Sequence, residues 1–150
     1  MVQPKFFPEG AVMAHVSGAV REFFREFQHR GRPADPGASA ELFAETFLAA
    51  GPDGARAVAR SDFAAVLRKR KEWLAGLGSS GAELVSLEET WLDRRYALVG
   101  TRWAMRFGAG REVEVASSYL MDVGGASPAI LVYLAHQDRM SALRVKGIVG

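Results

Sequence analysis

The first half of the chain repeats apolar residues at steps of three and four, the spacing of a helix with one apolar face. One stripe predicts a helix that stops near Gly31, and it consists of Val12, Val16, Val20, Phe23, Phe24 and Phe27. A second stripe predicts a helix that begins at Ser39 and is ended by the turn residues 51–54. This second stripe consists of Leu42, Phe43, Phe47 and Leu48.

A third helix is predicted to begin at Ser61 or Asp62 and to end at the glycine-rich residues 76–81. Its apolar side carries Phe63, Val66, Leu67 and Leu74. Residues 55–60, just before it, fit either a short strand or a connector. The basic run at residues 68–71 lies within this helix, where consecutive residues point around most of the circumference. We therefore interpret the run as solvated surface in preference to a phosphate-binding patch.

The second half of the chain changes to the two-residue period of strands. Four strands are predicted, over residues 82–92, 95–107, 112–123 and 129–138. The short turns between them favour an antiparallel meander. Helices first and strands afterwards is typical of an α+β fold, in which helices cover one face of an antiparallel sheet.

The loop at residues 108–110 sets the register of the central hairpin. It places Met105 opposite Val113, Trp103 opposite Val115 and, on the other face, Arg106 opposite Glu112. The apolar side of this hairpin is expected to face the helices, because cross-strand neighbours on one face pack together.

The last predicted strand is apolar on both sides, since residues 130–134 read Ile-Leu-Val-Tyr-Leu. Tyr96, Leu98 and Leu120 also fall on the outer side of the sheet. A strand that is buried on both faces needs a cover outside the sheet. We therefore expect a homodimer in which the outer faces of two sheets pack together.

This order of elements resembles the nuclear transport factor 2-like superfamily, which includes scytalone dehydratase, ketosteroid isomerase and the SnoaL-like polyketide cyclases. Three segments look like those of SnoaL-like bacterial proteins: Val-Arg-Glu-Phe-Phe-Arg-Glu-Phe at 20–27, Thr-Arg-Trp-Ala-Met-Arg-Phe at 101–107, and Leu-Ala-His-Gln-Asp at 134–138. The resemblance implies a single SnoaL-like domain over residues 1–150, with its core at about 11–138.

The same resemblance implies a cystatin-like fold, with N-terminal helices packed on a curved antiparallel sheet that forms a cone. Members of the superfamily use the cone for isomerase, dehydratase or cyclase chemistry, for binding small ligands, or purely for protein contacts. The fold therefore does not decide the function.

Composition excludes several kinds of chemistry. The 150-residue chain has no cysteine, which rules out disulfides, zinc–thiolate sites and thiol nucleophiles. A net charge of only +2, with basic and acidic residues nearly balanced in each half of the chain, does not favour nucleic-acid binding. No apolar run is long enough to span a bilayer. We expect a cytoplasmic protein with no nucleic-acid partner, no membrane partner and no cofactor.

Acid–base chemistry inside a cone needs a base and a hydrogen-bond donor that both face inward. Tyr119 is the clearest donor, although it also fits a core position, and Ser117 lies one step away on the same face. Of the adjacent Glu88 and Glu89, one is expected to point inward because strand residues alternate.

The choice between these two carboxylates rests on two arguments that conflict. A two-residue loop at residues 93–94 favours Glu88, whereas burial of Val85, Leu87 and Trp91 favours Glu89. We take Glu88 as the candidate by a small margin.

His136 and Asp138 share one side of the last predicted strand, and such a pair could orient an imidazole as a base. The sequence does not fix whether that side faces the cone. His15 and His29 are interpreted as surface or packing residues, and no combination of His, Asp and Glu has metal-ligand spacing. The catalytic candidates are therefore Tyr119, Glu88 and His136, with no metal site.

The inward aromatic residues predict a pocket for a small apolar molecule. Its candidate ligand-binding residues are Phe24, Phe27, Trp103, Phe107 and Ser117. The sequence leaves open whether acid–base chemistry of the isomerase, cyclase or dehydratase type accompanies binding, and so whether the protein is an enzyme. The alternative hypothesis is a non-catalytic, dimeric protein-interaction module of the same fold.

Overall fold

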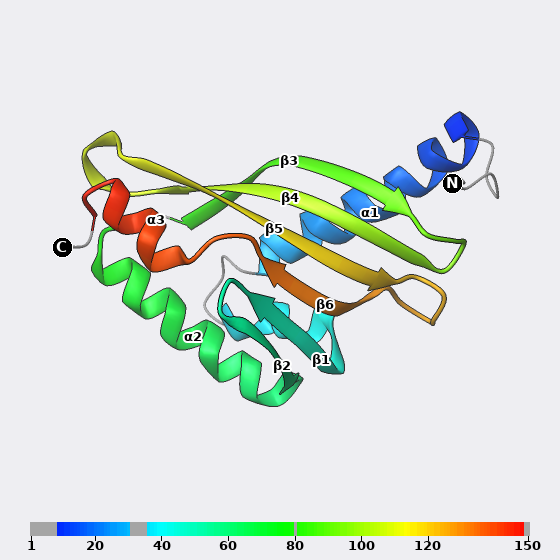
Figure 1. Cartoon of the computed structure of the whole chain (residues 1–150), viewed down its shortest axis with the longest axis horizontal. Coiled ribbons are helices and arrows are strands. Elements are labelled where there is room, and N and C mark those ends of the chain that lie inside the picture. The colour runs from blue at the N-terminus through cyan, green and yellow to red at the C-terminus, as the bar shows by residue number, and fades with distance from the viewer. Residues whose placement is uncertain (1–8, 31–35, 80, 149–150) are drawn as a thin grey trace.

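Six strands form one curved sheet, and α1 passes behind β3, β4 and β5 in the view of Figure 1. The computed structural model describes residues 9–30, 36–79 and 81–148. In chain order the elements are α1 (Glu9–Arg30), η1 (Pro36–Leu42), β1 (Phe43–Gly51), β2 (Gly54–Ala59), α2 (Arg60–Gly76), β3 (Gly81–Trp91), β4 (Tyr96–Arg106), η2 (Gly108–Gly110), β5 (Glu112–Asp122), β6 (Ala129–Ala135) and α3 (Arg139–Val145). The predicted α+β class, with helices on a curved, mostly antiparallel sheet, is confirmed.

The strand order is β2-β1-β6-β5-β4-β3. The four strands β3 to β6 form the predicted antiparallel meander. β1 extends the sheet beyond β6 as its parallel neighbour, and β2 pairs antiparallel with β1 at the edge. Residues 55–60, which fitted either a strand or a connector, therefore belong mostly to a strand.

The second predicted helix is wrong over most of its length. Only residues 36–42 are helical, as the short 3₁₀ helix η1, and the chain then becomes β1. Phe43 and Phe47 are four positions apart, which puts them on one side of a strand as well as on one side of a helix. Both side chains are buried, and β1 gains strand partners along both edges. Pairing with β2 and β6 decides between two local structures that the pattern allows equally.

The central hairpin has the predicted register. Its three predicted pairs are all present: Met105 with Val113, Trp103 with Val115, and Arg106 with Glu112. The loop is closed by the Phe107 amide, which donates to the Arg111 carbonyl at 2.8 Å. Ala109 and Gly110 turn the chain with φ angles of 64° and 70°, in the left-handed region.

The larger of two buried clusters lies between α1 and the inner face of the sheet, which is the face toward α1 and α2. α1 contributes Val20, Phe23 and Phe24, as the first apolar stripe predicts. A further member of the stripe, Phe27, is partly buried and packs against this cluster. The side chains of the remaining two, Val12 and Val16, lie outside the part of the chain that the structure describes.

The smaller cluster lies at the far end of the β4–β5 hairpin, where it joins Met105, Phe107 and Val113 to Leu143. Leu143 belongs to α3, a helix that the sequence reading does not predict, and its side chain is fully buried. The packed core therefore continues past residue 138.

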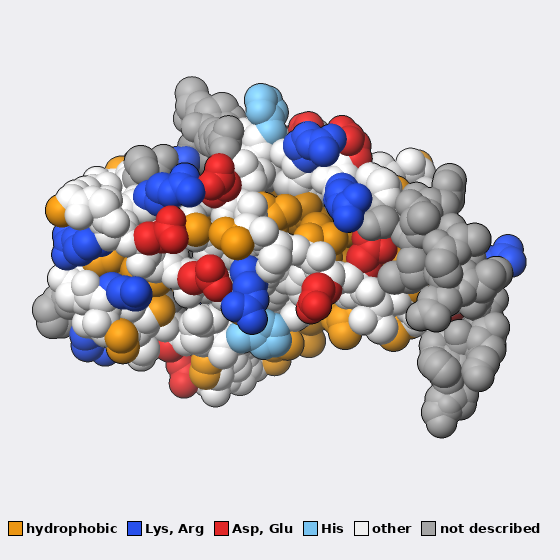
Figure 2. Space-filling model, turned by 90° about the horizontal axis from the view of Figure 1, so that it is seen from above, with side chains coloured by type: hydrophobic (Ala, Val, Ile, Leu, Met, Phe, Trp, Pro, Cys, Tyr) orange, Lys and Arg blue, Asp and Glu red, His pale blue; other side chains and the backbone are white. Residues whose placement is uncertain are grey.

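On the face shown in Figure 2, basic and acidic side chains are interspersed, and hydrophobic side chains are exposed between them. Neither sign of charge forms a continuous area on this face, unlike the basic surface of a nucleic-acid-binding protein. Within the described ranges, no helix has both the length and the apolar character that crossing a bilayer requires.

Candidate functional site

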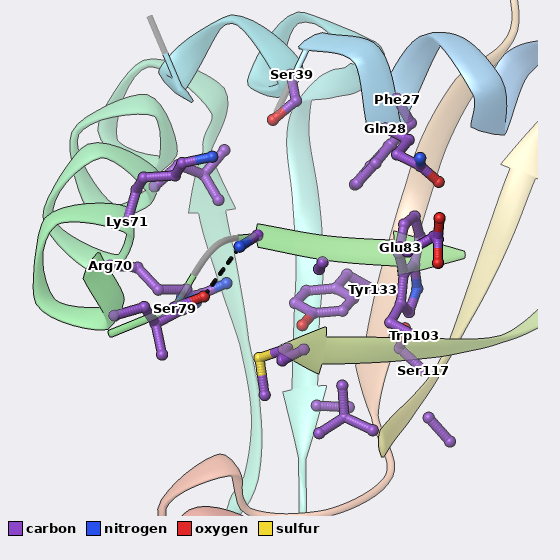
Figure 3. Close-up of a pocket in the computed structure, with 18 of the residues that line it drawn as sticks. Phe27, Gln28, Ser39, Arg70, Lys71, Ser79, Glu83, Trp103, Ser117 and Tyr133 are labelled. Atoms are coloured by element: carbon purple, nitrogen blue, oxygen red, sulfur yellow. Dashed lines mark hydrogen bonds between the residues drawn. The ribbon is translucent and has the colours of Figure 1, made fainter. Parts of the chain in front are cut away.

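A cavity of about 850 Å³ lies between the helices α1 and α2 and the inner face of the sheet. It is lined by residues from α1, η1 and α2 on one side and from β1 and β3 to β6 on the other. Figure 3 shows the labelled residues converging on it from these elements. This volume falls within the range of pockets that bind cofactors and drug-sized molecules.

Aromatic rings form one wall of the cavity. The ring of Tyr119 stacks on that of Tyr133, with centroids 5.5 Å apart and planes 15° from parallel. Phe27, from α1, lies 5.8 Å from both Trp103 and Tyr119, measured between ring centroids. Phe43 of β1 completes the set at 5.9 Å from Phe27. An apolar molecule in the cavity would meet ring faces and edges along this wall.

Below these rings, four side chains of β4 and β5 form a buried hydrogen-bond network. Trp103 Nε1 donates to Thr101 Oγ1 at 2.8 Å, and Thr101 Oγ1 donates to the Ser117 carbonyl at 2.9 Å. Ser117 Oγ lies 3.0 Å from Thr101 Oγ1 and donates to the Tyr119 hydroxyl oxygen at 3.1 Å. The network follows from strand geometry, because residues two apart share a face and Thr101 pairs with Ser117 across the ladder.

The Tyr119 phenol sits at the end of this network. When Ser117 donates to it, its own O–H has no other hydrogen-bond partner within the described part of the chain, so it can donate to a bound molecule. Burial raises the pKa of Tyr119 well above its usual range, and the nearby Tyr133 adds to the rise. The polar groups of Ser117, Thr101 and Trp103 act on this pKa in the opposite direction, but their effects are smaller. Tyr119 is therefore a neutral donor at any physiological pH.

Two more polar side chains reach the cavity. Gln28 Oε1 accepts the backbone N–H of Leu84 at 2.9 Å, which leaves the Gln28 amide N–H groups to face the cavity. The Tyr133 hydroxyl also lines the cavity and makes no hydrogen bond with the residues that the structure describes. Both are available as donors.

Charged side chains also line the cavity. Among the described residues, the lining carboxylates are Glu83 and Asp138, and the cations are Arg70, Lys71 and Arg106. Arg106 is bonded to Glu83 at 2.8 Å and to Glu112 at 3.2 Å. Within the described residues, no three His, Asp or Glu side chains come together as a metal site would require.

Asp138 is tied to the first turn of α3. The Ser141 hydroxyl donates to its Oδ2 at 2.9 Å. This bond, with smaller contributions from nearby backbone amides and Arg144, holds the pKa of the Asp138 carboxyl below its usual range. The carboxylate is thus ionised and already engaged as an acceptor.

Four of the predicted site residues line the cavity together: Tyr119, Phe27, Trp103 and Ser117. Phe24 does not line it. Its fully buried ring packs against Phe23 and Tyr119 in the core behind the wall. Phe107 also lies elsewhere, in the cluster that α3 covers. The prediction placed Phe107 on the inner face correctly, but the unpredicted α3 occupies the space in front of it.

The choice of Glu88 as the inward carboxylate is wrong. Glu88 pairs with Gly100 and is exposed, whereas Glu89 pairs with the buried Val99 on the inner face. The loop between β3 and β4 has four residues where two were predicted, because Asp93 Oδ1 accepts the backbone amides of Arg95 and Tyr96. A shift of one residue in register turns every side chain to the other face.

Glu89 itself does not line the cavity. Its Oε1 accepts a hydrogen bond from Trp91 Nε1 at 3.0 Å. Its Oε2 is buried and has no hydrogen-bond partner among the described residues. The inward carboxylate therefore lies on β3 outside the cavity lining, in the same cross-strand row as Val99 and Tyr119.

The prediction that His136 serves as a base in the cone is not supported by its position. Its Nε2 lies 2.6 Å from Ser118 Oγ, a side chain on the outer face of the sheet, and the imidazole is exposed. β6 ends at Ala135, one residue before it. His29 is exposed on α1, and His15 lies outside the residues whose side chains are described.

Tyr133, Gln28, Arg70 and Lys71 line the cavity and were not among the predicted site residues. The sequence pattern could have placed Tyr133 at the site. Side chains alternate along the last strand, and its pairing with β5 puts Tyr133 opposite Tyr119. Helical spacing could have placed Arg70 and Lys71 there too, since they follow Leu67 by three and four residues and so share its face of α2. No sequence pattern pointed to Gln28, because its hydrogen bond to β3 depends on the irregular stretch of that strand near Leu84.

Solved structures with a similar fold were found by structural comparison. A nuclear transport factor 2-like protein with a cystatin-like fold from Novosphingobium aromaticivorans superposes with a TM-score of 0.68 at 15% sequence identity, over 93% of this chain and 92% of that chain. The chain has the nuclear transport factor 2-like fold. A protein of this fold and of unknown function from Shewanella oneidensis gives a TM-score of 0.66 at 11% identity, over 81% of this chain and 99% of that one.

Nuclear transport factor 2 itself, from Cryptosporidium parvum, superposes with a TM-score of 0.61 at 10% identity, over 81% of this chain and 94% of that chain. No protein-family model and no curated protein matches the sequence. At these identities the likeness shows the nuclear transport factor 2-like fold alone, and the function has to be argued from the site.

Proposed function

We propose that the protein binds a small, largely apolar molecule in the cavity and orients it through an acceptor oxygen on that molecule. The observation that carries the proposal is the meeting of an 850 Å³ space with an aromatic wall and a short row of donors. The rings of Phe27, Trp103 and Tyr133 provide apolar contact area. The hydroxyls of Tyr119 and Tyr133 and the amide of Gln28 provide hydrogen bonds. Such a combination is characteristic of small-molecule sites.

The buried network makes Tyr119 a well-positioned donor. The hydrogen bond from Ser117 and contacts with Phe24 and Phe27 hold the phenol in one place, so that it loses little conformational freedom when a ligand binds. Its high pKa keeps the proton on the oxygen. A carbonyl, ether or hydroxyl oxygen of the ligand would accept that proton in a hydrogen bond.

Acid–base chemistry on the bound molecule would have to use Glu83 or Asp138, the carboxylates that line the cavity among the described residues. Glu83 accepts from Arg106 and Asp138 accepts from Ser141. Because both are already engaged as acceptors, the geometry supports binding better than it supports proton transfer.

Isothermal titration calorimetry with acetylnaphthalene tests the proposal, because this ligand joins a flat apolar body to one neutral acceptor. We expect one molecule to bind per chain. Ala135→Leu is expected to weaken binding by about tenfold or more, because the added atoms fill part of the cavity. Ala57→Leu, an equal change on the exposed edge strand β2, serves as the control. Absence of binding, or equal weakening by both variants, would contradict the proposal.

A second candidate function is association with another copy of the chain through the outer face of the sheet. An apolar row crosses four strands there, because Leu48 pairs with Val132, Val132 with Leu120, and Leu120 with Leu98. The two ends of the row are strongly exposed, at 41% for Leu48 and 43% for Leu98. The ion pair Arg102–Glu114 lies on the same face, beyond Gly100 and Ser118, and its two opposite charges can both find partners on an identical surface. The row and the cavity lie on opposite faces, so the two functions are compatible.

A further inference from the structure

The sheet-facing side of α2 carries two cations where its pattern calls for apolar residues. Phe63, Leu67, Arg70, Lys71 and Leu74 recur at helical spacing, and all five line the cavity. Figure 3 shows Arg70 and Lys71 extending from α2 toward the sheet strands. The basic run that was interpreted as solvated surface thus sends half of its residues inward.

One flank of the same helix exposes apolar side chains to solvent. Val66 and Trp73 are 44% and 43% exposed, although Val66 was expected to share the buried side with Phe63. Partial burial costs Arg70 and Lys71 some of their hydration, although both side chains also interact with other groups of the protein. A negative group in the cavity would lie within reach of two cations that already line it.

The hydrogen-bonding groups of the cavity also favour a negative ligand. Arg and Lys side chains can only donate. Gln28 has its carbonyl oxygen occupied by the Leu84 amide, and Tyr119 accepts from Ser117, so that both present N–H or O–H groups to a ligand. Glu83 and Asp138, the lining carboxylates of the described residues, accept from Arg106 and Ser141. The complement of such a surface is a ligand rich in acceptor oxygens and negative in charge.

We propose that the ligand is an amphipathic organic anion, with an apolar body against the aromatic wall and its carboxylate or phosphate group held by Arg70 and Lys71. This inference rests on the proposed function, because it names the class of ligand that the same cavity takes. Arg70 brings a planar fork that suits two oxygens of one anion, and Lys71 brings a compact charge. Together they would fix which end of the ligand lies near α2.

Calorimetry with naphthoate and acetylnaphthalene separates this inference from the proposed function, because the two ligands share an aromatic body and differ in the anionic group. The wild-type protein is expected to bind naphthoate about tenfold more tightly or better, as hydrogen bonds to charged groups allow. The double variant Arg70→Gln with Lys71→Gln is expected to lose the preference and keep its affinity for acetylnaphthalene. Lys69→Gln, the control for Lys71→Gln, removes one positive charge from an exposed position on α2 and is expected to keep the preference.

Urea unfolding checks that each variant is folded, and Lys71→Gln alone is measured if the double variant is not. Equal affinity for the two ligands would overturn the inference and leave the proposed function standing, whereas binding of neither would overturn both. A preference that survives loss of the cavity cations, or that Lys69→Gln also abolishes, would overturn the assignment to Arg70 and Lys71. Complete displacement of naphthoate by an equal concentration of inorganic phosphate would also overturn it, because the apolar body would then contribute nothing.

Discussion

Two tyrosines face the cavity side by side but differ in what their hydroxyls bond. Tyr119 accepts from Ser117 within the buried network, and Tyr133 makes no hydrogen bond with the described residues. Tyr119→Phe is therefore expected to lower the free energy of unfolding by about 1 kcal/mol, the usual contribution of one hydrogen bond. Tyr133→Phe is expected to change it by no more than about 0.5 kcal/mol. Urea denaturation of both variants measures the difference, and equal losses would contradict the network.

The raised pKa of Tyr119 makes stability depend on pH in the alkaline range. An unfolded tyrosine releases its proton near the ordinary value of 10.0, whereas folded Tyr119 keeps it. The folded state then binds more protons than the unfolded state, so the free energy of unfolding falls as pH rises above that value, by up to about 1.4 kcal/mol per pH unit. The stabilisation by protonated Tyr119 is fully present at pH values below the pKa of an unfolded tyrosine. Unfolding of the wild type and Tyr119→Phe across this range measures the slope, which the variant is expected to reduce; equal slopes would refute the assignment.

At the scale of elements, the loop η2 carries backbone strain that can be relieved. Ala109 has a φ of 64°, a conformation that costs an alanine about 1 kcal/mol and an asparagine less. Ala109→Asn is expected to stabilise the protein by about 0.5 kcal/mol. Gly110→Ala is expected to destabilise the protein by about 1 kcal/mol, because an alanine would have to adopt a left-handed φ. No steric clash adds to this cost, since a Cβ there would meet no atom within 4 Å. Thermal and urea unfolding test the pair, and effects of the same sign would contradict this explanation.

Elements with strict alternation could be predicted from the sequence, and elements decided by their neighbours could not. The β4–β5 register followed from one loop and from the side-chain pattern. β1 was predicted as a helix because the spacing of Phe43 and Phe47 fits both structures, and only its pairing with β2 and β6 resolves the choice. The inward carboxylate was misassigned because a hydrogen-bonded loop at Asp93 changed the register of β3 by one residue.

The candidate site could be predicted only where it lies on regular strands. Trp103, Ser117 and Tyr119 followed from alternation, and the structure brings them together. His136 was misplaced because the sequence does not show that β6 ends before it. The cations of α2 were taken for surface because a run of four basic residues looks solvated, although Arg70 and Lys71 share a helix face with Leu67. A charge placed on the apolar face of a helix is the signal that would have found them.

At the scale of the whole molecule, the apolar row on the outer face predicts a dimer. Sedimentation equilibrium is expected to give twice the mass of one chain. Leu98→Glu is expected to give a folded monomer, because Leu98 is exposed within one chain and would place a charge in the interface. Val145→Glu, an equal change on the exposed surface of α3, is expected to leave the dimer intact. A wild-type monomer, or dissociation by both variants, would contradict this role of the outer face.

Nuclear Overhauser contacts from bound acetylnaphthalene would show whether a ligand occupies the cavity. The naphthalene protons are expected to contact the rings of Phe27, Trp103 and Tyr133, which line one cavity. The acetyl methyl group is expected to lie near Tyr119, whose hydroxyl would donate to the carbonyl oxygen. Contacts confined to Leu98 and Leu120 on the outer face, or the absence of any contact within the cavity, would contradict the account.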